Sequence, residues 1–406
     1  MSRLNLYFTA KYGKPKICFY NKVNHKITKF LLSLLLISIL FLPTLQSKVQ
    51  ALAEPEMRVL ILKDNFLRIR SDKTIPLIVK GDMFANKRVK GITVKKNDTK
   101  TILFFDKDKT KLYELDNTEG FEVRSSDKKG IWVGGKRFSG KINVTSLENG
   151  IYAVNVLGVE EYLSSVVGSE MPYKWPMEAL KAQAIASRTY ALKKKNNDLF
   201  DIDSTKNDQV YNGLESETDN TRKAVRRTRS MVILHNKKLI NALFHSSSGG
   251  MTENSEDVWD NELPYLVSVK DFDTNNPKRN WKKIFLETDL EELFPKIGGI
   301  KQIQILELSG SGRIKKVEIF GNYGSMLMKG TELRKKLDLK STLFRFKFVK
   351  SNNKTVLLIK GMGSGHGVGM SQWGARFMAK AGYKANEILE YFYTGVEIKP
   401  FDESYI

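Results

Sequence analysis

Short apolar runs separated by turn-forming residues dominate the chain from residue 57 to about residue 156. Gly, Asn, Asp and Lys lie between the runs, which is typical of β-strands joined by tight turns. The predicted strands are Arg58–Lys63, Ile75–Lys80, Thr101–Phe105, Gly130–Val133 and Ile151–Val156. The pattern therefore predicts a β-rich N-terminal region.

The segment 172–195 has a different pattern, which predicts a helix. Pro176 suits the first turn of a helix, where its missing N–H costs nothing. Glu178 lies near the positive end of the helix dipole and Lys193–Lys195 at its negative end. The alanines between them favour a helix and permit close packing on both sides. We expect this helix to be central to the fold.

The rest of the chain mixes both kinds of element. We predict a basic helix at 218–231, strands at 231–235, 238–244, 302–307, 315–320 and 343–349, a short helix near 289–294, and helices at Ser371–Ala381 and Ala385–Tyr393, which end at Gly382 and Gly395. The expected fold class is α+β, with a strand-rich N-terminal region, a central alanine-rich helix, mixed sheets and two C-terminal helices.

The expected organisation has five segments. They are a basic leader with a signal peptide or anchor (1–53), a β-rich region (54–140), a core with a Glu-Met-Pro motif (141–270), a lysine-rich β insertion or subdomain (271–350), and a C-terminal segment with a Gly-His-Gly motif and helices that complete the core (351–406).

The apolar run at 30–42 indicates export. Lys22, Lys26 and Lys29 precede it and Ala51–Ala53 follows it as a small-x-small site, which is the order of a secretory signal. The run is shorter than the ~20 residues of a typical membrane-spanning helix, and it has no polar face, which argues against a buried core helix. We expect an exported protein, in the periplasm, in the cell wall or at the outer face of the membrane. Cleavage near Ala53 and retention of 30–42 as a membrane anchor both remain open.

Charge favours an anionic partner without identifying it. The net charge is +22; residues 1–53 hold eight Lys or Arg and no acidic residue, and the remainder carries +14. A wall polymer, an acidic polysaccharide, lipid headgroups or simply a solvated lysine-rich surface would all fit. Export argues against nucleic acid. The single cysteine, Cys18, excludes an intramolecular disulfide and a thiolate metal site.

Glu170 is the candidate catalytic residue. It is followed by Met171–Pro176, an apolar and rigid setting that contains two prolines, a tyrosine and a tryptophan. Apolar surroundings raise the pKa of a carboxyl group and favour the protonated form that a general acid needs. A solvated loop carboxylate, or a charge at a helix N-terminus, is the alternative.

Three further polar segments are candidates for ligand binding: 204–213, 244–253 and 361–374. In the last, alternating glycines predict a tight loop before a helix N-terminus, where N–H groups could face an anion or a sugar oxygen. No βαβ unit follows, so a dinucleotide site is disfavoured. His245 and Ser248 do not have the spacing of a nucleophile elbow, and His245 with His366 is a weak zinc set.

These segments together resemble the SpoIID/LytB family. The resemblance rests on Val-Val-Gly-Ser-Glu-Met-Pro (166–172), the alanine-rich helix through Ser-Arg-Thr-Tyr (187–190), Gln-Val-Tyr-Asn-Gly (209–213), Ser-Ser-Gly-Gly-Met-Thr-Glu (247–253) and Gly-His-Gly-Val-Gly-Met-Ser-Gln-Trp-Gly (365–374). It covers about residues 130–400.

The resemblance implies one of two activities. Members are lytic transglycosylases that cut peptidoglycan glycan strands, preferentially strands without stem peptides, to leave 1,6-anhydro ends; others enhance an N-acetylmuramoyl-L-alanine amidase, which would be the cell-wall partner. The family's catalytic acid falls on Glu170. The expected substrate-binding residues are Arg188, Tyr190, Gln209, Tyr211, Ser248, His366, Ser371 and Gln372. Some members bind zinc through His and Cys, but this chain has Ser246–Ser248 there, so we expect no metal and no other cofactor.

Overall fold

The computed structural model describes residues 54–405, except 80–86, 98, 126, 197, 260 and 352–353. The apolar run at 30–42 and the site at Ala51–Ala53 lie outside these residues, so export stays a prediction. Within the described ranges, no helix is long and apolar enough to cross a membrane.

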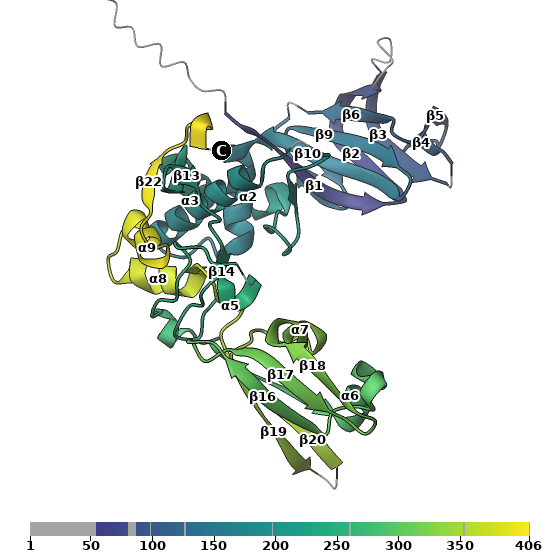
Figure 1. Cartoon of the computed structure of the whole chain (residues 1–406). Coiled ribbons are helices and arrows are strands. Elements are labelled where there is room, and N and C mark those ends of the chain that lie inside the picture. The colour runs from purple at the N-terminus through teal and green to yellow at the C-terminus, as the bar shows by residue number, and fades with distance from the viewer. Residues whose placement is uncertain are drawn as a thin grey trace, which may run out of the picture. The chain divides into compact units, whose positions relative to one another are not determined.

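The N-terminal region is an 11-stranded sheet (Figure 1). Its strands are β1 (Glu56–Asp64), β2 (Phe66–Val79), β3 (Lys87–Lys96), β4 (Thr101–Phe105), β5 (Lys111–Leu115), β6 (Gly120–Arg124), β7 (Ile131–Val133), β8 (Lys136–Phe138), β9 (Lys141–Leu147), β10 (Gly150–Gly158) and β11 (Ile202–Asp203). The order is β11-β1-β10-β9-β6-β2-β3-β4-β5, with β7 pairing with β2 and β8. Each of the five predicted strands overlaps one observed strand, namely β1, β2, β4, β7 or β10; Gly130 lies just before β7, and Lys80 lies outside the described residues. The sheet continues past residue 140 to Gly158.

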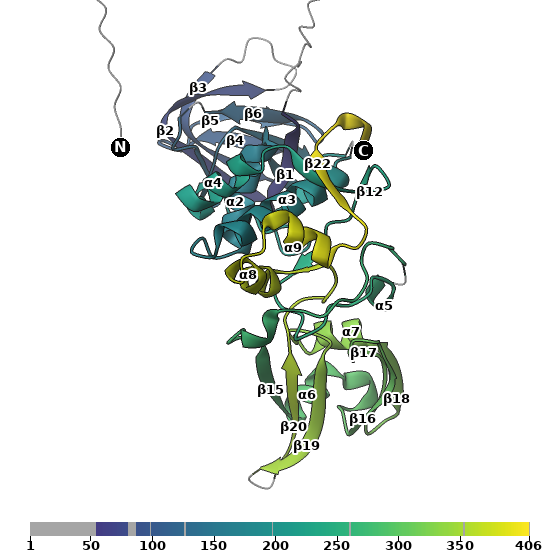
Figure 2. The ribbon, with the colours of Figure 1, turned by 90° about the vertical axis from the view of Figure 1, so that its left-hand side faces the viewer.

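Helices pack around the predicted alanine-rich helix. These are α2 (Val159–Glu170), α3 (Met177–Lys194), α4 (Asp219–Arg227), α8 (Gln372–Lys380) and α9 (Ala385–Phe392). The predicted central helix is confirmed as α3, which contacts the other four and buries almost every residue between Ala179 and Leu192 (Figure 2). Its alanines allow neighbours to approach from several sides, which is why this helix has no single apolar stripe. The two predicted C-terminal helices are confirmed as α8 and α9, whereas the basic helix ends at Arg227 rather than at 231.

Two small sheets join distant parts of the chain to this helical layer. The first contains β12 (Met231–His235), β13 (Lys238–Leu239) and β22 (Glu397–Pro400). In the second, β14 (Phe244–His245) pairs in parallel with β21 (Met370–Ser371), which brings the serine-rich segment beside the glycine loop. The strand predicted at 238–244 is therefore wrong in its middle, where the chain leaves one sheet and enters the other.

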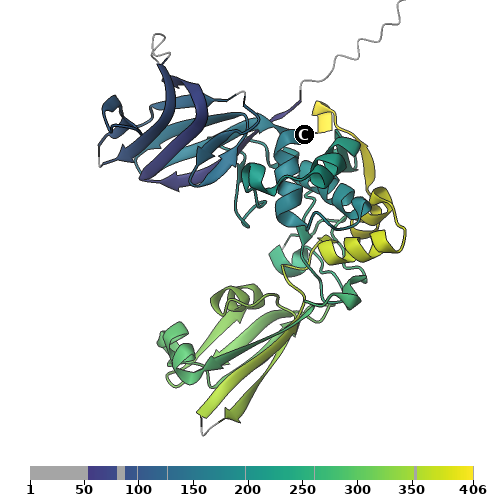
Figure 3. The ribbon, with the colours of Figure 1, turned by 180° about the vertical axis from the view of Figure 1, so that it is seen from behind.

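Residues 280–362 form a lobe with its own hydrophobic core (Figure 3). The elements are β15 (Asn280–Leu286), α6 (Glu287–Leu293), β16 (Gln302–Leu308), β17 (Ile314–Phe320), β18 (Ser325–Lys329), α7 (Gly330–Lys336), β19 (Phe344–Ser351) and β20 (Lys354–Met362). They make two three-stranded sheets, β15-β20-β19 and β16-β17-β18. The predicted strands and the short helix of this segment are confirmed, and with them the α+β class.

Candidate functional site

Glu170 is the last residue of α2, and segments from two other parts of the chain meet its carboxyl group. The backbone N–H of Val210 donates to Oε1 at 2.9 Å, and Nε2 of Gln372, the first residue of α8, donates to Oε2 at 3.2 Å. The glutamate is therefore neither a solvated loop carboxylate nor a charge at a helix N-terminus. The structure brings Glu170 together with Gln372, one of the predicted binding residues.

Burial raises the pKa of Glu170 above its ordinary value, while the hydrogen bonds from Val210 and Gln372 act in the opposite direction. The position at the C-terminal end of α2 acts in the same direction as burial, because the partial negative charge of a helix C-terminus disfavours a carboxylate. This carboxyl group therefore keeps its proton to a higher pH than an ordinary glutamate does, and two donors stabilise the anion that remains after the proton has left.

Gln372 is held in place by α3. Its Nε2 also lies 3.5 Å from Oε1 of Gln183, whose own amide donates to the hydroxyl of Ser187 at 2.9 Å. At the start of α8, the hydroxyl of Ser371 accepts from the N–H of Gly374 at 3.1 Å and caps the helix. Ser371 and Gln183 thus position the amide that faces Glu170.

The loop that carries Val210 is fixed by buried polar side chains. Tyr162 donates to Oε1 of Gln209 at 3.0 Å, and Gln209 donates to the carbonyl of Ser187 at 3.3 Å. Tyr211 donates to Asn155 at 2.7 Å. Gln209 and Tyr211 are almost completely buried. The structure places these two predicted binding residues behind the site, where they position the Val210 N–H.

Tyr190 acts on the same loop from α3. Its hydroxyl donates to Asp208 at 2.9 Å, and Oδ2 of Asp208 accepts from the N–H of Asp203 at 3.0 Å. Asp208 also pairs with Lys194 at 3.1 Å. These bonds to the carboxylate outweigh burial and lower the pKa of Asp208. This carboxyl group is therefore ionised, and both of its oxygens already have hydrogen-bond partners.

Glycine at 168 lets the loop pack against α2 two residues before Glu170. A Cβ at Gly168 would lie 1.9 Å from the carbonyl oxygen of Ser216, in the 3-10 turn Gly213–Ser216. The hydroxyl of Ser169 donates to that of Ser216 at 3.0 Å and accepts from Asn212 at 3.1 Å. The Val-Gly-Ser-Glu sequence is thus required by close contact between α2 and the loop.

An aromatic cluster with an arginine lies on the two segments that flank Glu170. Trp175, five residues after Glu170, meets Trp373, next to Gln372, with ring centroids 4.9 Å apart. The guanidinium of Arg376 lies 5.2 Å from the first ring and 4.6 Å from the second. All three side chains are partly exposed. They offer a partly exposed aromatic surface with a positive charge beside it.

Arg188 lies elsewhere. It is completely buried and makes two hydrogen bonds to Glu160, at 2.9 and 2.6 Å, and one to the carbonyl of Met231 at 3.0 Å. Glu160 also accepts from the N–H of Ser230 at 3.1 Å. The structure therefore does not bring Arg188 to Glu170; the arginine joins α2, α3 and β12.

Ser248, in the serine-rich segment 244–253, and His366, in the glycine loop 361–369, do not contact the carboxyl group of Glu170. Ser248 donates to Asp271 at 2.5 Å. The Nε2–H of His366 donates to the carbonyl of Phe244 at 3.0 Å, and Nδ1 accepts from the N–H of Val368 at 3.1 Å. Burial lowers the pKa of His366 to about 4, so its imidazole is neutral at physiological pH.

The described residues do not fit a zinc site. Nδ1 of His245 bonds to the carbonyl of Val368 at 3.1 Å, and its buried Nε2 meets no hydrogen-bond partner among the described residues. In the part of the chain that the structure describes, no three His, Cys, Asp or Glu side chains gather to hold a metal ion. The hydroxyls of Ser247 and Ser248 are bonded to carboxylates instead.

Comparison with known proteins agrees with this architecture. Residues 147–235 match the family model described as "Stage II sporulation protein", and residues 285–369 match a domain of unknown function. Stage II sporulation protein D of Bacillus subtilis is 34% identical over 277 residues, which cover 62% of this chain and 77% of the relative. The chain belongs to the SpoIID family.

Two other relatives are similar to this SpoIID-family protein. An uncharacterized protein of Brachyspira hyodysenteriae is 34% identical over 292 residues, with 70% of this chain and 77% of the relative covered. The amidase enhancer of Bacillus subtilis is 32% identical over 292 residues, with 59% and 40% covered. The predicted family resemblance is confirmed.

Sequence reasoning missed three contributors to the site: the Val210 N–H, Gln183 and the Trp373–Arg376 cluster. A signal existed for the cluster, because Trp175 and Trp373 each lie close to a predicted site residue in a short motif. The N–H of Val210 had no such signal, since any residue carries one.

Proposed function

We propose that this protein is a lytic transglycosylase that cleaves the glycan strands of peptidoglycan, with Glu170 as general acid and then general base. The observation that carries the proposal is the largely buried carboxyl group of Glu170, whose pKa is raised by burial and whose two oxygens face the Val210 N–H and the Gln372 amide. The relative named Stage II sporulation protein D supports a role in the cell wall. The leader at 1–53 supports an exported location.

One carboxyl group is sufficient for this reaction. Ordinary glycosidases use two, an acid and a base or nucleophile. In the proposed reaction the protonated Glu170 gives its proton to the glycosidic oxygen as the C1–O bond breaks. The carboxylate then takes the proton of the same sugar's C6 hydroxyl, whose oxygen bonds to C1 and closes the anhydro ring. The glutamate ends protonated, as it began. The reaction therefore requires neither a water molecule nor a second carboxyl group.

The hydrogen bonds at Glu170 suit both steps. Val210 and Gln372 donate to the carboxylate that exists between the two proton transfers, and they keep its oxygens oriented. Asp208, on the same loop, does not compete as an acid because it is ionised and bonded to Tyr190 and Lys194. Trp175 and Trp373 would support the sugar rings on either side of the cleaved bond.

The test is digestion of purified glycan strands without stem peptides by the full chain and by Glu170→Gln. General acid–base catalysis contributes about 10²–10⁴ in rate, so the variant should release no anhydro-ended fragments on the time scale of the unaltered protein. Glu161→Gln is the matched control, because Glu161 is exposed on the same helix. Mass spectrometry of the products reads the outcome. Equal release of anhydro fragments by Glu170→Gln would refute the proposed role.

The alternative is that the protein enhances a cell-wall amidase, which the relative named amidase enhancer supports. Glu170 would then be dispensable. An amidase assay on whole cell walls distinguishes the two: stimulation that persists with Glu170→Gln, together with no glycan cleavage by the unaltered protein, would favour the enhancer.

A further inference from the structure

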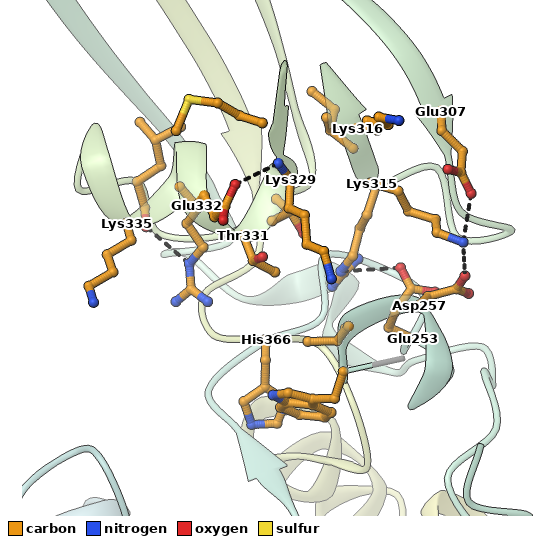
Figure 4. A pocket seen from close by; sticks show the side chains of 18 of the residues that line it. Glu253, Asp257, Glu307, Lys315, Lys316, Lys329, Thr331, Glu332, Lys335 and His366 are labelled. Carbon is orange, nitrogen blue, oxygen red and sulfur yellow. Dashed lines mark hydrogen bonds and ion pairs between the residues drawn. The ribbon is translucent and has the colours of Figure 1, made fainter. Parts of the chain in front are cut away.

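A cavity of about 980 Å³ separates the 280–362 lobe from the glycine loop (Figure 4). Its walls come from the segment 253–259, from His366, and from β16, β17, β18 and α7 of the lobe. Most of the lobe's contribution lies within 285–369, the stretch that matches a domain of unknown function. Glu170 is not one of the lining residues.

The carboxylates that line this cleft already have partners. Asp257 and Glu307 both pair with Lys315, at 2.9 and 2.7 Å. Glu253 is almost completely buried and accepts hydrogen bonds from two serine hydroxyls, at 2.5 and 2.7 Å. Figure 4 shows Asp257 and Glu307 on either side of the Lys315 ammonium. These acidic groups therefore do not repel an incoming anion as free carboxylates would.

The cations are in excess, and several are uncommitted. Seven Lys or Arg side chains line the cleft against five Asp or Glu. Lys206, Lys316 and Lys335 are exposed and form no ion pair with any described residue. The lining carries both signs of charge, with two more cations than carboxylates. An excess of cations, several of them without an ion pair among the described residues, favours an anionic ligand.

The cleft also has an aromatic wall. The side chain of Trp259 is 46% exposed, and its ring lies 5.1 Å from the ring of His366, with the rings tilted by 56°. Since His366 is neutral and bonded through both nitrogens, it supports the indole without adding charge. An exposed indole beside free ammonium groups suits a sugar ring that bears an anionic substituent.

The cleft and Glu170 share one loop. Lys206 and Asn207 line the cleft, and Val210 of the same loop donates to Glu170. Four residues of chain span at most about 14 Å when fully extended. The edge of the cleft at Lys206 therefore lies within the length of a few sugars of the loop residue that contacts Glu170.

We propose that this cleft binds carboxylate-bearing sugars of the same glycan strand that is cut at Glu170, through Lys316 and Lys335 on the lobe and Trp259 on the opposite wall. The inference rests on the proposed function for the identity of the polymer. It gives the 280–362 lobe a role in substrate selection: strands with free carboxylates on their sugars are preferred to strands in which these groups are neutral.

The test measures binding by the full chain with Glu170→Gln in place, so that the strands stay intact. Two preparations of peptide-free strands are compared, one with its lactyl carboxylates free and one with them converted to amides. The double variant Lys316→Gln/Lys335→Gln should bind the free-carboxylate strands about three- to ten-fold more weakly, as expected for the loss of two exposed ion pairs. It should bind the amidated strands unchanged.

The matched control is Lys296→Gln/Lys336→Gln, which removes the same charge from exposed positions of the same lobe outside the cleft. It should leave both affinities within two-fold, on the order of the effect of distant surface charges. Equal binding of free-carboxylate strands by the cleft variant and the control would overturn the proposal. The proposal would also be overturned if the double variant in the cleft bound free-carboxylate and amidated strands with equally reduced affinity. Binding would then not depend on the charge of the carboxylates.

A third arm separates carboxylate from phosphate. A glycerol-phosphate polymer is used as competitor; if it displaces the glycan strands at lower concentration than a carboxylated glycan does, the cleft is a phosphate site and the proposal is wrong. These binding measurements do not depend on whether Glu170 is catalytic. Charge-dependent binding without any cleavage by the unaltered protein would refute the transglycosylase and leave the cleft assignment standing.

Discussion

Replacement of Gln372 tests whether the hydrogen bonds at Glu170 set its pKa. In Gln372→Leu the carboxylate loses the donor at 3.2 Å but keeps the Val210 N–H at 2.9 Å. Hydrogen bonds to charged groups contribute about 1.5–3 kcal/mol. This one is long and shared with Gln183, at 3.5 Å, so we take about 1 kcal/mol, or about 0.7 pKa unit. The pKa of Glu170 should rise by that amount.

The assay is the pH dependence of kcat/KM for strand cleavage. Because the protonated form of Glu170 starts the proposed reaction, activity should fall as pH rises through its pKa. The alkaline limb of the profile should therefore move upward in Gln372→Leu. It should move further in Gln372→Glu, where a second carboxylate adds like-charge repulsion.

The order of the three profiles is the decisive result. An alkaline limb that stays in place in Gln372→Leu, or moves to lower pH, would show that Gln372 does not stabilise the Glu170 carboxylate. The midpoint of thermal unfolding, measured for each variant at each pH, controls for loss of folded protein. A lower plateau with an unmoved limb would indicate a positioning role without an effect on the pKa.

Two further predictions concern stability. Burial raises the pKa of Glu170 in the folded state, so the native protein loses stability as pH rises from the ordinary glutamate pKa through the raised pKa. Glu170→Gln should therefore unfold at a higher temperature than the native protein at pH 8 and at the same temperature at pH 3.5. Differential scanning fluorimetry measures both unfolding temperatures. Arg188→Met leaves Glu160 buried without its partner, which should cost about 3–5 kcal/mol in urea unfolding, and adding Glu160→Gln should recover part of this loss; a cost below about 1 kcal/mol would contradict the ion pair seen between α2 and α3.

The central helix could be predicted from the sequence because its signals are local. Pro176, the alanines and the terminal lysines all lie within α3 itself. Helix α2 was not anticipated, since β10 passes directly into it at Gly158 and the valines of both segments carry the same β-branched character. The sequence pattern does not change at the point where the backbone does.

The candidate site was predicted in part for the same reason. Glu170 stands out through its apolar neighbours, and Gln372 through its motif, but a separation of 202 positions in the sequence hides the contact. Arg188 was assigned to substrate binding as a polar residue of the family motif; its partner Glu160 lies 28 residues earlier and on another helix. Burial and pairing of this kind depend on the tertiary structure and leave no periodic trace.

The cleft beside the lobe was beyond sequence reasoning altogether. Lysines such as Lys316 and Lys335 look the same in the sequence as Lys296 and Lys336, which lie outside the cleft. Only the pairing of β17 with β18 and the packing of α7 against them decide which ammonium groups share one hollow.

The lobe leaves and re-enters the rest of the protein at neighbouring points. The N–H of Gly363 donates to the carbonyl of Arg279 at 2.8 Å, and β15 and β20 run antiparallel from there. The lobe has a separate core, and its two ends are joined by a hydrogen bond. A module of this kind can be gained, exchanged or lost during evolution through a change at this one junction. The helices around Glu170 need not move when that happens, so the proposed selectivity for the polymer could change while the proposed catalytic site stays the same.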